Sequence, residues 1–142
     1  MPGYSGTPLA KKLGIKAGFR VFFVNIPDEV RAELRAALAD CTVESQTNSR
    51  NKKPAGVLDF AMVFTKSAAE LESEFARISR LLAPAGMLWV NWPKKSSGVA
   101  TDLSEDSVRE IGLRAGLVDV KVCAVTDVWS GLKFVRRLKD RK

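Results

Sequence analysis

One segment of the sequence gathers several groups that bind anions. Residues 92–98 read WPKKSSG, so two ammonium groups, two hydroxyls and a glycine lie close together. Ammonium and hydroxyl groups hydrogen-bond phosphate and carboxylate oxygens, and a glycine leaves its backbone amide open to a ligand. The candidate ligand-binding residues here are Trp92, Lys94, Lys95, Ser96, Ser97 and Gly98. The alternative interpretation is a solvated loop beside a core tryptophan.

Further candidates lie just after, or between, predicted strands. They are Asn25, Lys66, Ser67, Asp127 and Trp129. Ser67 begins a predicted helix, whose first amides favour anions, and the ring of Trp129 offers a surface on which a planar group can stack. Ligands of open parallel sheets bind outside the carboxyl ends of the strands, near the point where strand order reverses. We therefore expect these residues and the WPKKSSG segment to share one edge of a sheet.

The sequence singles out no catalytic pair. Carboxylates and ammonium groups that are available for acid–base or electrostatic roles are Asp28, Asp102, Asp127, Lys66, Lys94 and Lys95, but no spacing selects two of them. Helix capping also accounts for Asp28 and Asp102. The chain has no histidine, which excludes Ser-His-Asp and Cys-His triads and histidine-ligated metals. We assign no catalytic residue and no metal.

Length and composition indicate one globular domain over residues 1–142. Hydrophobic residues make up 46% of the chain and charged residues 27%, which is enough apolar material for one core. The net charge is +7, of which the last eight residues contribute +4. Within the domain we distinguish a basic lead-in at 1–18, an exposed loop at 46–56 and a basic tail at 139–142.

The cysteine spacing, the apolar runs and the N-terminal pattern favour a cytoplasmic protein. Cys41 and Cys123 lie 82 positions apart and form no C-x-x-C pair, so we expect two reduced thiols. No apolar run approaches the roughly 20 residues of a membrane span, and the N-terminus lacks the pattern of a signal peptide. The sequence predicts no membrane partner.

Strands and helices alternate along the chain. Apolar runs at Arg20–Val24, 57–64 and 87–92 are typical of strands buried on both faces, and a weak strand is expected at 41–44. Helices begin at Asp28, after a predicted Ser67–Glu70 capping box, and after Ser104. Residues 84–86 (Pro-Ala-Gly) should end the second helix, and Gly116 should end the third in a left-handed conformation.

The last two strands complete the predicted fold. Residues 118–122 alternate between apolar and polar, which predicts a half-exposed strand, and residues 129–138 form its antiparallel partner. The order of elements predicts an α/β fold with three layers. Its sheet is doubly wound and mostly parallel, with about six strands and an antiparallel last strand.

The segment 59–90 resembles the class I S-adenosylmethionine-dependent methyltransferases. An aspartate in a strand and a capped helix precede RLLAPAG at 80–86 and MLWV at 87–90, which is similar to the RxLxPGG passage of that family. LGIKAG at 13–18 and AGL at 115–117 also resemble its first-strand lead-in and its closing strands. The resemblance covers about two-thirds of the chain and implies a methyltransferase-like fold.

The sequence departs from that family where the cofactor binds. The family's first strand leads into a glycine-rich loop, because glycine has no Cβ and tolerates unusual dihedrals. Here the strand leads into Asn25, Ile26 and Pro27, and no glycine occurs between Gly18 and Gly56. We expect Ile26 and Pro27 to obstruct the turn and the ligand. The sequence therefore predicts no cofactor, with S-adenosylmethionine not bound in the usual mode.

The region between the first strand and residue 57 also differs from that family. The short segment between the first strand and residue 57 implies that one strand–helix unit of the family is missing. Glu44, at the end of the weak strand, stands as a candidate for the carboxylate that holds the ribose hydroxyls in the family.

The whole chain resembles a bacterial family of uncharacterised proteins. The shared motifs are GYSGTPLAKKLG at 3–14, WPKKSSG at 92–98 and VKVCAV…WSGLK at 120–133. This resemblance brings no assigned activity.

Three functions remain open from the sequence. The first is a non-catalytic binding or regulatory protein on a degenerate methyltransferase-like scaffold, which binds an anionic ligand or a protein partner at the carboxyl edge of the sheet. The second is a divergent S-adenosylmethionine-dependent methyltransferase. The third is a nucleic-acid-binding protein that uses the basic residues 136–142, which are expected to run free of the domain after the last strand, through a salt-sensitive contact. A solvated basic tail is the alternative to the third.

Overall fold

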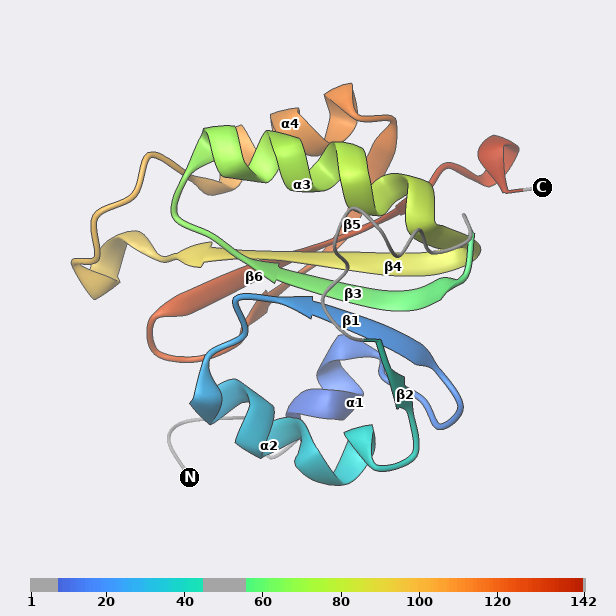
Figure 1. Cartoon of the computed structure of the whole chain (residues 1–142). Coiled ribbons are helices and arrows are strands. Elements are labelled where there is room, and N and C mark those ends of the chain that lie inside the picture. Colours follow the sequence, from blue (N-terminus) through green and yellow to red (C-terminus); the bar gives the residue numbers. More distant parts are fainter. Residues whose placement is uncertain (1–7, 45–55, 142) are drawn as a thin grey trace.

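The computed structural model describes residues 8–44 and 56–141, which form a six-stranded sheet with helices on both faces (Figure 1). The strands are β1 Arg20–Val24, β2 Thr42–Val43, β3 Leu58–Phe64, β4 Leu82–Pro93, β5 Leu117–Ala124 and β6 Trp129–Arg136. The helices are α1 Leu9–Leu13, α2 Asp28–Leu38, α3 Ala68–Leu81 and α4 Glu105–Arg114, with short 3-10 turns η1 Lys95–Ser97 and η2 Leu138–Asp140.

The sheet topology confirms the predicted fold class. The strands lie in the order β2-β1-β3-β4-β6-β5. Strands β1 to β4 pair in parallel, whereas β6 runs antiparallel to both β4 and β5. The sequence pattern placed β6 beside β5, and the structure adds that β6 also pairs with β4. This insertion makes β5 an edge strand.

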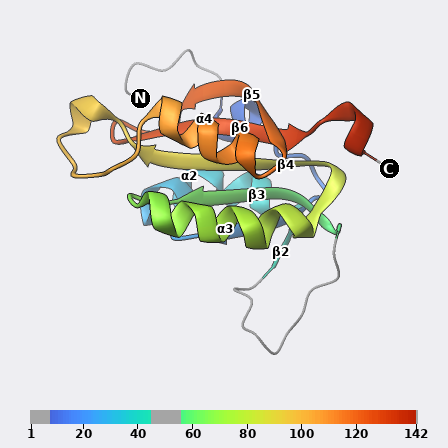
Figure 2. The same cartoon turned by 90° about the horizontal axis from the view of Figure 1, so that it is seen from above.

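The sheet divides the core into two layers, each covered by helices. Helices α1 and α2 cover one face of the sheet, and α3 and α4 lie side by side over the other (Figures 1 and 2). Alternate residues of β1 serve the two layers: Phe22 and Val24 pack in the cluster of α3 and α4, while Val21 and Phe23 pack in that of α1 and α2. This two-sided burial explains the continuous apolar runs of the parallel strands.

Part of the predicted lead-in belongs to the core. Residues 9–13 form α1, with Leu9 and Leu13 buried, and Gly14 ends this helix in the left-handed region at φ 87°. The indole Nε1 of Trp89 donates a hydrogen bond of 2.9 Å to the carbonyl of Leu13. This bond attaches α1 to the centre of the sheet. Residues 3–7 of the N-terminal motif and residues 45–55 of the predicted loop lie outside the described residues.

The ends of α3 differ from the sequence prediction. The Ser67 hydroxyl accepts the Glu70 amide as expected, but the Ser67 amide donates to Thr65 Oγ1, and the Glu70 carboxylate accepts the Thr65 hydroxyl. The prediction of a reciprocal Ser67–Glu70 capping box is therefore wrong: the serine half forms, but the Glu70 carboxylate does not accept the Ser67 amide. At the other end, β4 begins at Leu82, directly after the helix, so that Pro-Ala-Gly at 84–86 lies inside the strand. A register shift in the β3–β4 pairing accommodates it.

The alternating segment 118–122 forms the middle of β5, and two of its three valines are exposed. Val120 and Val122 keep 54% and 49% of their surface accessible. The β5–β6 pairing shifts register between Asp119 and Lys121, and this bulge breaks the alternation of faces. The pattern therefore identified the strand correctly but not its two faces.

The basic residues at the end of the chain fall into two groups: Arg136, the last residue of β6, is bound to the domain, and residues 137–140 after it are exposed. The Arg136 guanidinium donates hydrogen bonds of 2.7 Å to the carbonyls of Ser79 and Leu82, near the end of α3. Arg137 pairs with Asp140 at 3.3 Å, and Arg141 Nε donates to the Arg136 carbonyl at 3.0 Å. The contacts of Arg137 and Arg141 are thus made within residues 136–141, which end in a short turn that projects from the domain (Figure 1). Among the described helices, none has the length and apolarity needed to cross a membrane.

Candidate functional site

The chain leaves the neighbouring parallel strands β1 and β3 toward opposite faces of the sheet. After β1 the chain enters α2 on one face, and after β3, the neighbour of β1, it enters α3 on the other (Figure 1). The two connecting loops therefore diverge and leave a crevice at the carboxyl edge. Such switch points are where open α/β sheets bind ligands.

A pocket of about 320 Å³ lies at this crevice, and we call it the edge pocket. Four residues predicted from the sequence line it: Asn25, Lys66, Ser67 and Trp129. Phe64, Thr65 and Glu70 complete the lining and were not among the site residues predicted from the sequence. Phe64 and Thr65 immediately precede Lys66, so extending the candidate set to the end of the strand would have found them. The expected convergence at the switch point is thus present for these four.

Asn25 makes the turn after β1 in a backbone conformation that favours glycine. Its φ of 58° lies in the left-handed region, which asparagine tolerates better than other side chains with a Cβ. The turn therefore forms, and the expectation that Ile26 and Pro27 obstruct it is wrong. Ile26 packs against the core cluster of α1 and α2, and Pro27 is the N-cap residue of α2.

The side chain of Asn25 also crosses the crevice. Its Nδ2 donates a hydrogen bond of 3.1 Å to the carbonyl of Phe64 at the end of β3. A glycine at this position would leave that space open. The side-chain amide thus bridges the two strands on either side of the switch point, where a bare backbone would let a ligand approach.

A buried hydroxyl orients the carboxylate in the edge pocket. Thr65 is only 3% exposed, and its hydroxyl donates to the carboxylate of Glu70. The Ser67 amide donates to the same Thr65 oxygen at 3.2 Å. Glu70 is therefore held at the start of α3 by a group that is itself fixed. The carboxylate of Glu70 and the ammonium of Lys66 give the lining one charge of each sign.

An aromatic pair forms the apolar part of the lining. The rings of Phe64 and Trp129 meet edge to face, with centroids 5.2 Å apart. Trp129 is half-buried, whereas Trp89 and Trp92 keep 0% and 5% of their surface accessible. Trp129 is thus the tryptophan with a ring surface toward the edge pocket, and a planar group can stack on it.

The first amides of α3 are partly occupied by the protein's own oxygens. The Ala68 amide donates to Asp102 Oδ1 at 2.8 Å, and the Glu70 amide donates to Ser67 Oγ at 3.2 Å. The carboxylate of Asp102 sits where an external anion would bind a helix N-terminus. The helix start that was predicted to bind an anion is therefore capped by the protein itself, and Asp102 caps α3 rather than its own segment.

The WPKKSSG segment does not line the edge pocket. Trp92 packs in the core beneath α3 and α4, and the residues after it form η1, which projects beyond the end of β4 (Figure 1). The Ser97 hydroxyl donates to the Lys94 carbonyl at 2.7 Å and accepts the Val99 amide at 3.2 Å, while Gly98 ends the turn at φ 76°. Lys95 and Ser96 lie within η1. The predicted candidates therefore fall into two groups at the same edge.

The turn between β5 and β6 joins these two groups. The Lys94 amide donates to the Val128 carbonyl at 2.7 Å, and Thr126 Oγ1 accepts the amides of Val128 and Trp129 at 3.1 Å each. Asp127 is exposed in this turn and does not line the edge pocket. The sequence prediction that this turn reaches the same edge is confirmed.

The remaining sequence candidates lie away from the edge pocket. Glu44 pairs with Arg20 at 3.6 Å, at the start of β1, so its carboxylate is directed away from the carboxyl edge. Asp28 is an exposed residue in the first turn of α2. Both cysteines are free, and burial raises the pKa of the Cys41 and Cys123 thiols. Among the described residues, no cluster of acidic or cysteine side chains has the arrangement of a metal site.

Solved structures with the same fold include methyltransferases. A SAM dependent methyltransferase from Aquifex aeolicus superposes with a TM-score of 0.67 at 18% identity, over 89% of this chain and 86% of the other. Geranyl diphosphate C-methyltransferase from Streptomyces coelicolor A3(2), in complex with geranyl diphosphate and S-adenosyl-L-homocysteine, gives 0.63 at 10% identity, over 91% and 77%. The PH0226 protein from Pyrococcus horikoshii OT3 gives 0.57 at 11% identity, over 92% and 87%.

These superpositions establish a methyltransferase-like fold. At such low sequence identity they establish nothing about activity. No curated protein matches the chain in sequence. One family profile, described as "Protein of unknown function (DUF3052)", matches residues 10–138. The resemblance to an uncharacterised family is thereby confirmed: the chain belongs to the DUF3052 family and has a methyltransferase-like fold.

Proposed function

We propose that this protein is a non-catalytic binding protein that holds a small ligand in the edge pocket. The observation that carries the proposal is the hydrogen bond from Asn25 Nδ2 to the Phe64 carbonyl, 3.1 Å long, at the switch point of the sheet. It puts a side chain where a glycine-rich loop lets a cofactor approach the backbone. The fold supports a ligand at this edge, and the bridge argues against the usual cofactor mode.

The lining suggests which ligand the pocket favours. Trp129 offers a ring surface for a planar group, and Lys66 an ammonium for an anionic substituent. Glu70, fixed by Thr65, accepts a hydrogen bond from a hydroxyl or amino group. We therefore propose a planar molecule that carries both an anionic group and a hydrogen-bond donor. The internal capping of α3 leaves Lys66 as the main contributor to anion binding in this pocket.

The alternative function is a divergent methyltransferase that binds its cofactor by another route. Its support is the fold shared with S-adenosylmethionine-dependent enzymes. A nucleic-acid-binding function has less support, because Arg136 donates to carbonyls of the domain, which leaves the few basic residues of the short turn after β6 as its candidate surface.

Tryptophan fluorescence tests the proposal, since Trp129 reports on the edge pocket. We would titrate the full chain with adenosine monophosphate as the planar anionic probe, and separately with S-adenosylhomocysteine. We expect adenosine monophosphate to change the emission saturably and S-adenosylhomocysteine to give no saturable change. The matched control is Trp129→Phe, in which the remaining buried tryptophans should not respond.

Two outcomes contradict the proposal. Saturable binding of S-adenosylhomocysteine, lost in Lys66→Gln and Trp129→Phe on calorimetry, favours the divergent methyltransferase and calls for a methyl-acceptor screen. Binding of neither probe removes the support for a planar anionic ligand in the edge pocket.

A further inference from the structure

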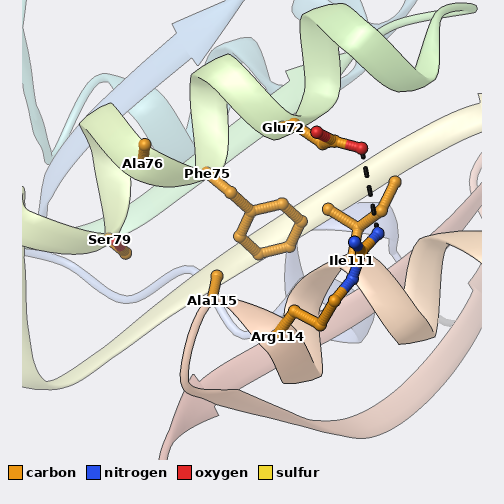
Figure 3. A pocket seen from close by; sticks show the side chains of 7 residues that line it. All are labelled: Glu72, Phe75, Ala76, Ser79, Ile111, Arg114 and Ala115. Carbon is orange, nitrogen blue, oxygen red and sulfur yellow. Dashed lines mark ion pairs between the residues drawn. The ribbon is translucent and has the colours of Figure 1, made fainter.

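A second hollow lies between α3 and α4, on the face of the sheet away from α1 and α2 (Figure 3). Its volume of about 390 Å³ falls within the range of small-molecule sites. The space exists because α3 contributes Ala76 and Ser79 and α4 is followed by Ala115, and these short side chains leave the groove between the helices unfilled. We call it the α3–α4 hollow.

The floor of the α3–α4 hollow is apolar and fixed. Phe75 and Ile111 point into the space between the helices and are only 1% and 5% exposed (Figure 3). The Phe75 ring meets the ring of Phe134 edge to face at 5.1 Å, so it cannot turn without disturbing β6. An apolar ring or chain of a ligand would therefore meet a preformed surface.

The rim of the hollow carries a weakly held guanidinium. Arg114 approaches Glu72 at 3.8 Å across the mouth, and the two side chains are 63% and 57% exposed. An exposed pair at this distance contributes little to stability, so a ligand can displace it at little cost. A second guanidinium, that of Arg136, is bound to the carbonyl of Ser79 at the other end of the hollow. The lining itself carries one guanidinium, that of Arg114, and one carboxylate, that of Glu72, and Arg136 adds a positive charge behind Ser79.

We propose that the α3–α4 hollow binds a small amphiphilic carboxylate. Its apolar part packs on Phe75 and Ile111, and its carboxylate takes the place of Glu72 beside Arg114. Arginine suits this role because its planar guanidinium forms paired hydrogen bonds with a carboxylate. The site is separate from the edge pocket and does not depend on what the edge pocket binds.

Sodium octanoate is a suitable probe for titration of the full ¹⁵N-labelled chain by NMR. With roughly ten non-hydrogen atoms, we expect a dissociation constant of about 10 mM or tighter. Saturable shifts should appear in amides of α3 and α4 around the hollow. The NMR signals of amides around the edge pocket should not shift.

Charge variants give the sharpest test, because they act in opposite directions. Arg114→Gln should weaken octanoate about tenfold, since a charge-assisted pair is lost. Glu72→Gln should tighten it about twofold to fivefold, since the competing carboxylate is removed. Both residues are mostly exposed, so both variants should keep the wild-type fold. Octylamine carries the opposite charge, so its affinity should rise in Arg114→Gln and fall in Glu72→Gln.

A filling variant tests the location independently of charge. Ala76→Leu should abolish saturable octanoate shifts, because the larger side chain occupies the hollow. Ala36→Leu, at an exposed position of α2 on the opposite face, is the matched control and should bind like the wild type. The proposal is overturned if wild-type protein shows no saturable shifts at α3 and α4. It is also overturned if Glu72→Gln weakens octanoate, or if Ala76→Leu binds it unchanged.

Discussion

The side-chain amide of Asn25 donates a hydrogen bond of 3.1 Å to the carbonyl of Phe64, and so joins the ends of β1 and β3 at the switch point of the sheet. Asn25 does this from the left-handed region, at φ 58°. The same residue therefore makes the sharp turn after β1 and closes part of the crevice beside it. In a glycine-rich loop the turn would form and the crevice would stay open.

This double role predicts a graded effect of substitution on stability. Asn25→Ala loses the hydrogen bond and places an unsuited side chain in the left-handed region, so we expect a loss of about 1–3 kcal/mol in the free energy of unfolding. Asn25→Gly loses the same bond but relieves the backbone, so the change should stay within about 1 kcal/mol. Urea unfolding measures both. A glycine variant less stable than the alanine variant would contradict this account of the turn.

Substitution of Asp102 gives a second prediction, because its effect on stability distinguishes a helix-capping role from a catalytic role. Its Oδ1 accepts the Ala68 amide at 2.8 Å, at the start of a helix that the chain reached 34 positions earlier. Asp102→Ala should lower the free energy of unfolding by about 1 kcal/mol, through loss of the cap and of a negative charge at the helix N-terminus. Asp102→Asn keeps an acceptor and should lose less. Urea unfolding checks this order of the two variants.

The control for Asp102 is another acid in a first helical turn. The Asp106 side chain is 96% exposed and contacts Arg109 at 3.3 Å, so Asp106→Ala should change stability by a few tenths of a kcal/mol. If Asp102→Ala left the unfolding midpoint unchanged, the capping role would be wrong. Its presence near the carboxyl edge would then need another explanation.

Local patterns of the sequence predicted most elements of the fold. The apolar run at Arg20–Val24 coincides with β1, and Ser104 caps α4 as expected. Such signals are local, because they depend on neighbours a few positions apart. The exposed face of β5 was not predictable in this way. It depends on a bulge in the pairing with β6, which is a relation between two strands.

The candidate site was predicted in part for the same reason. Topology alone brought Asn25, Lys66, Ser67 and Trp129 to one edge, since the carboxyl ends of parallel strands meet there. The sequence pattern did not reveal that the Thr65 hydroxyl donates a hydrogen bond to the Glu70 carboxylate. Nor did it reveal that Asp102 would occupy the start of α3. Both facts arise from side-chain competition for the same amides and oxygens, which only the folded arrangement decides.

Lys133 gives the last prediction, on the dependence of stability on pH. It is half-buried on β6 directly opposite Lys121 of β5, and no acidic side chain pairs with it among the described residues. Burial first, and the charge of Lys121 second, lower the pKa of Lys133 in the folded state. The folded protein therefore releases this proton at a lower pH than the unfolded chain does. The charged form costs stability at neutral pH, and this cost disappears as pH rises through the lowered pKa toward the ordinary lysine value.

Lys133→Met should therefore raise the free energy of unfolding at pH 7, by up to about 1 kcal/mol from the like-charge pair alone. The gain should shrink toward pH 10.5, at which the unfolded lysine also loses its proton, and the Lys121 contribution should shrink in high salt. Urea unfolding of both proteins between pH 7 and about pH 10 measures the difference. Lys139→Met, at an exposed position of η2, is the control and should show no such pH dependence. A gain that grows with pH would reverse the sign and refute the assignment of a lowered pKa to Lys133.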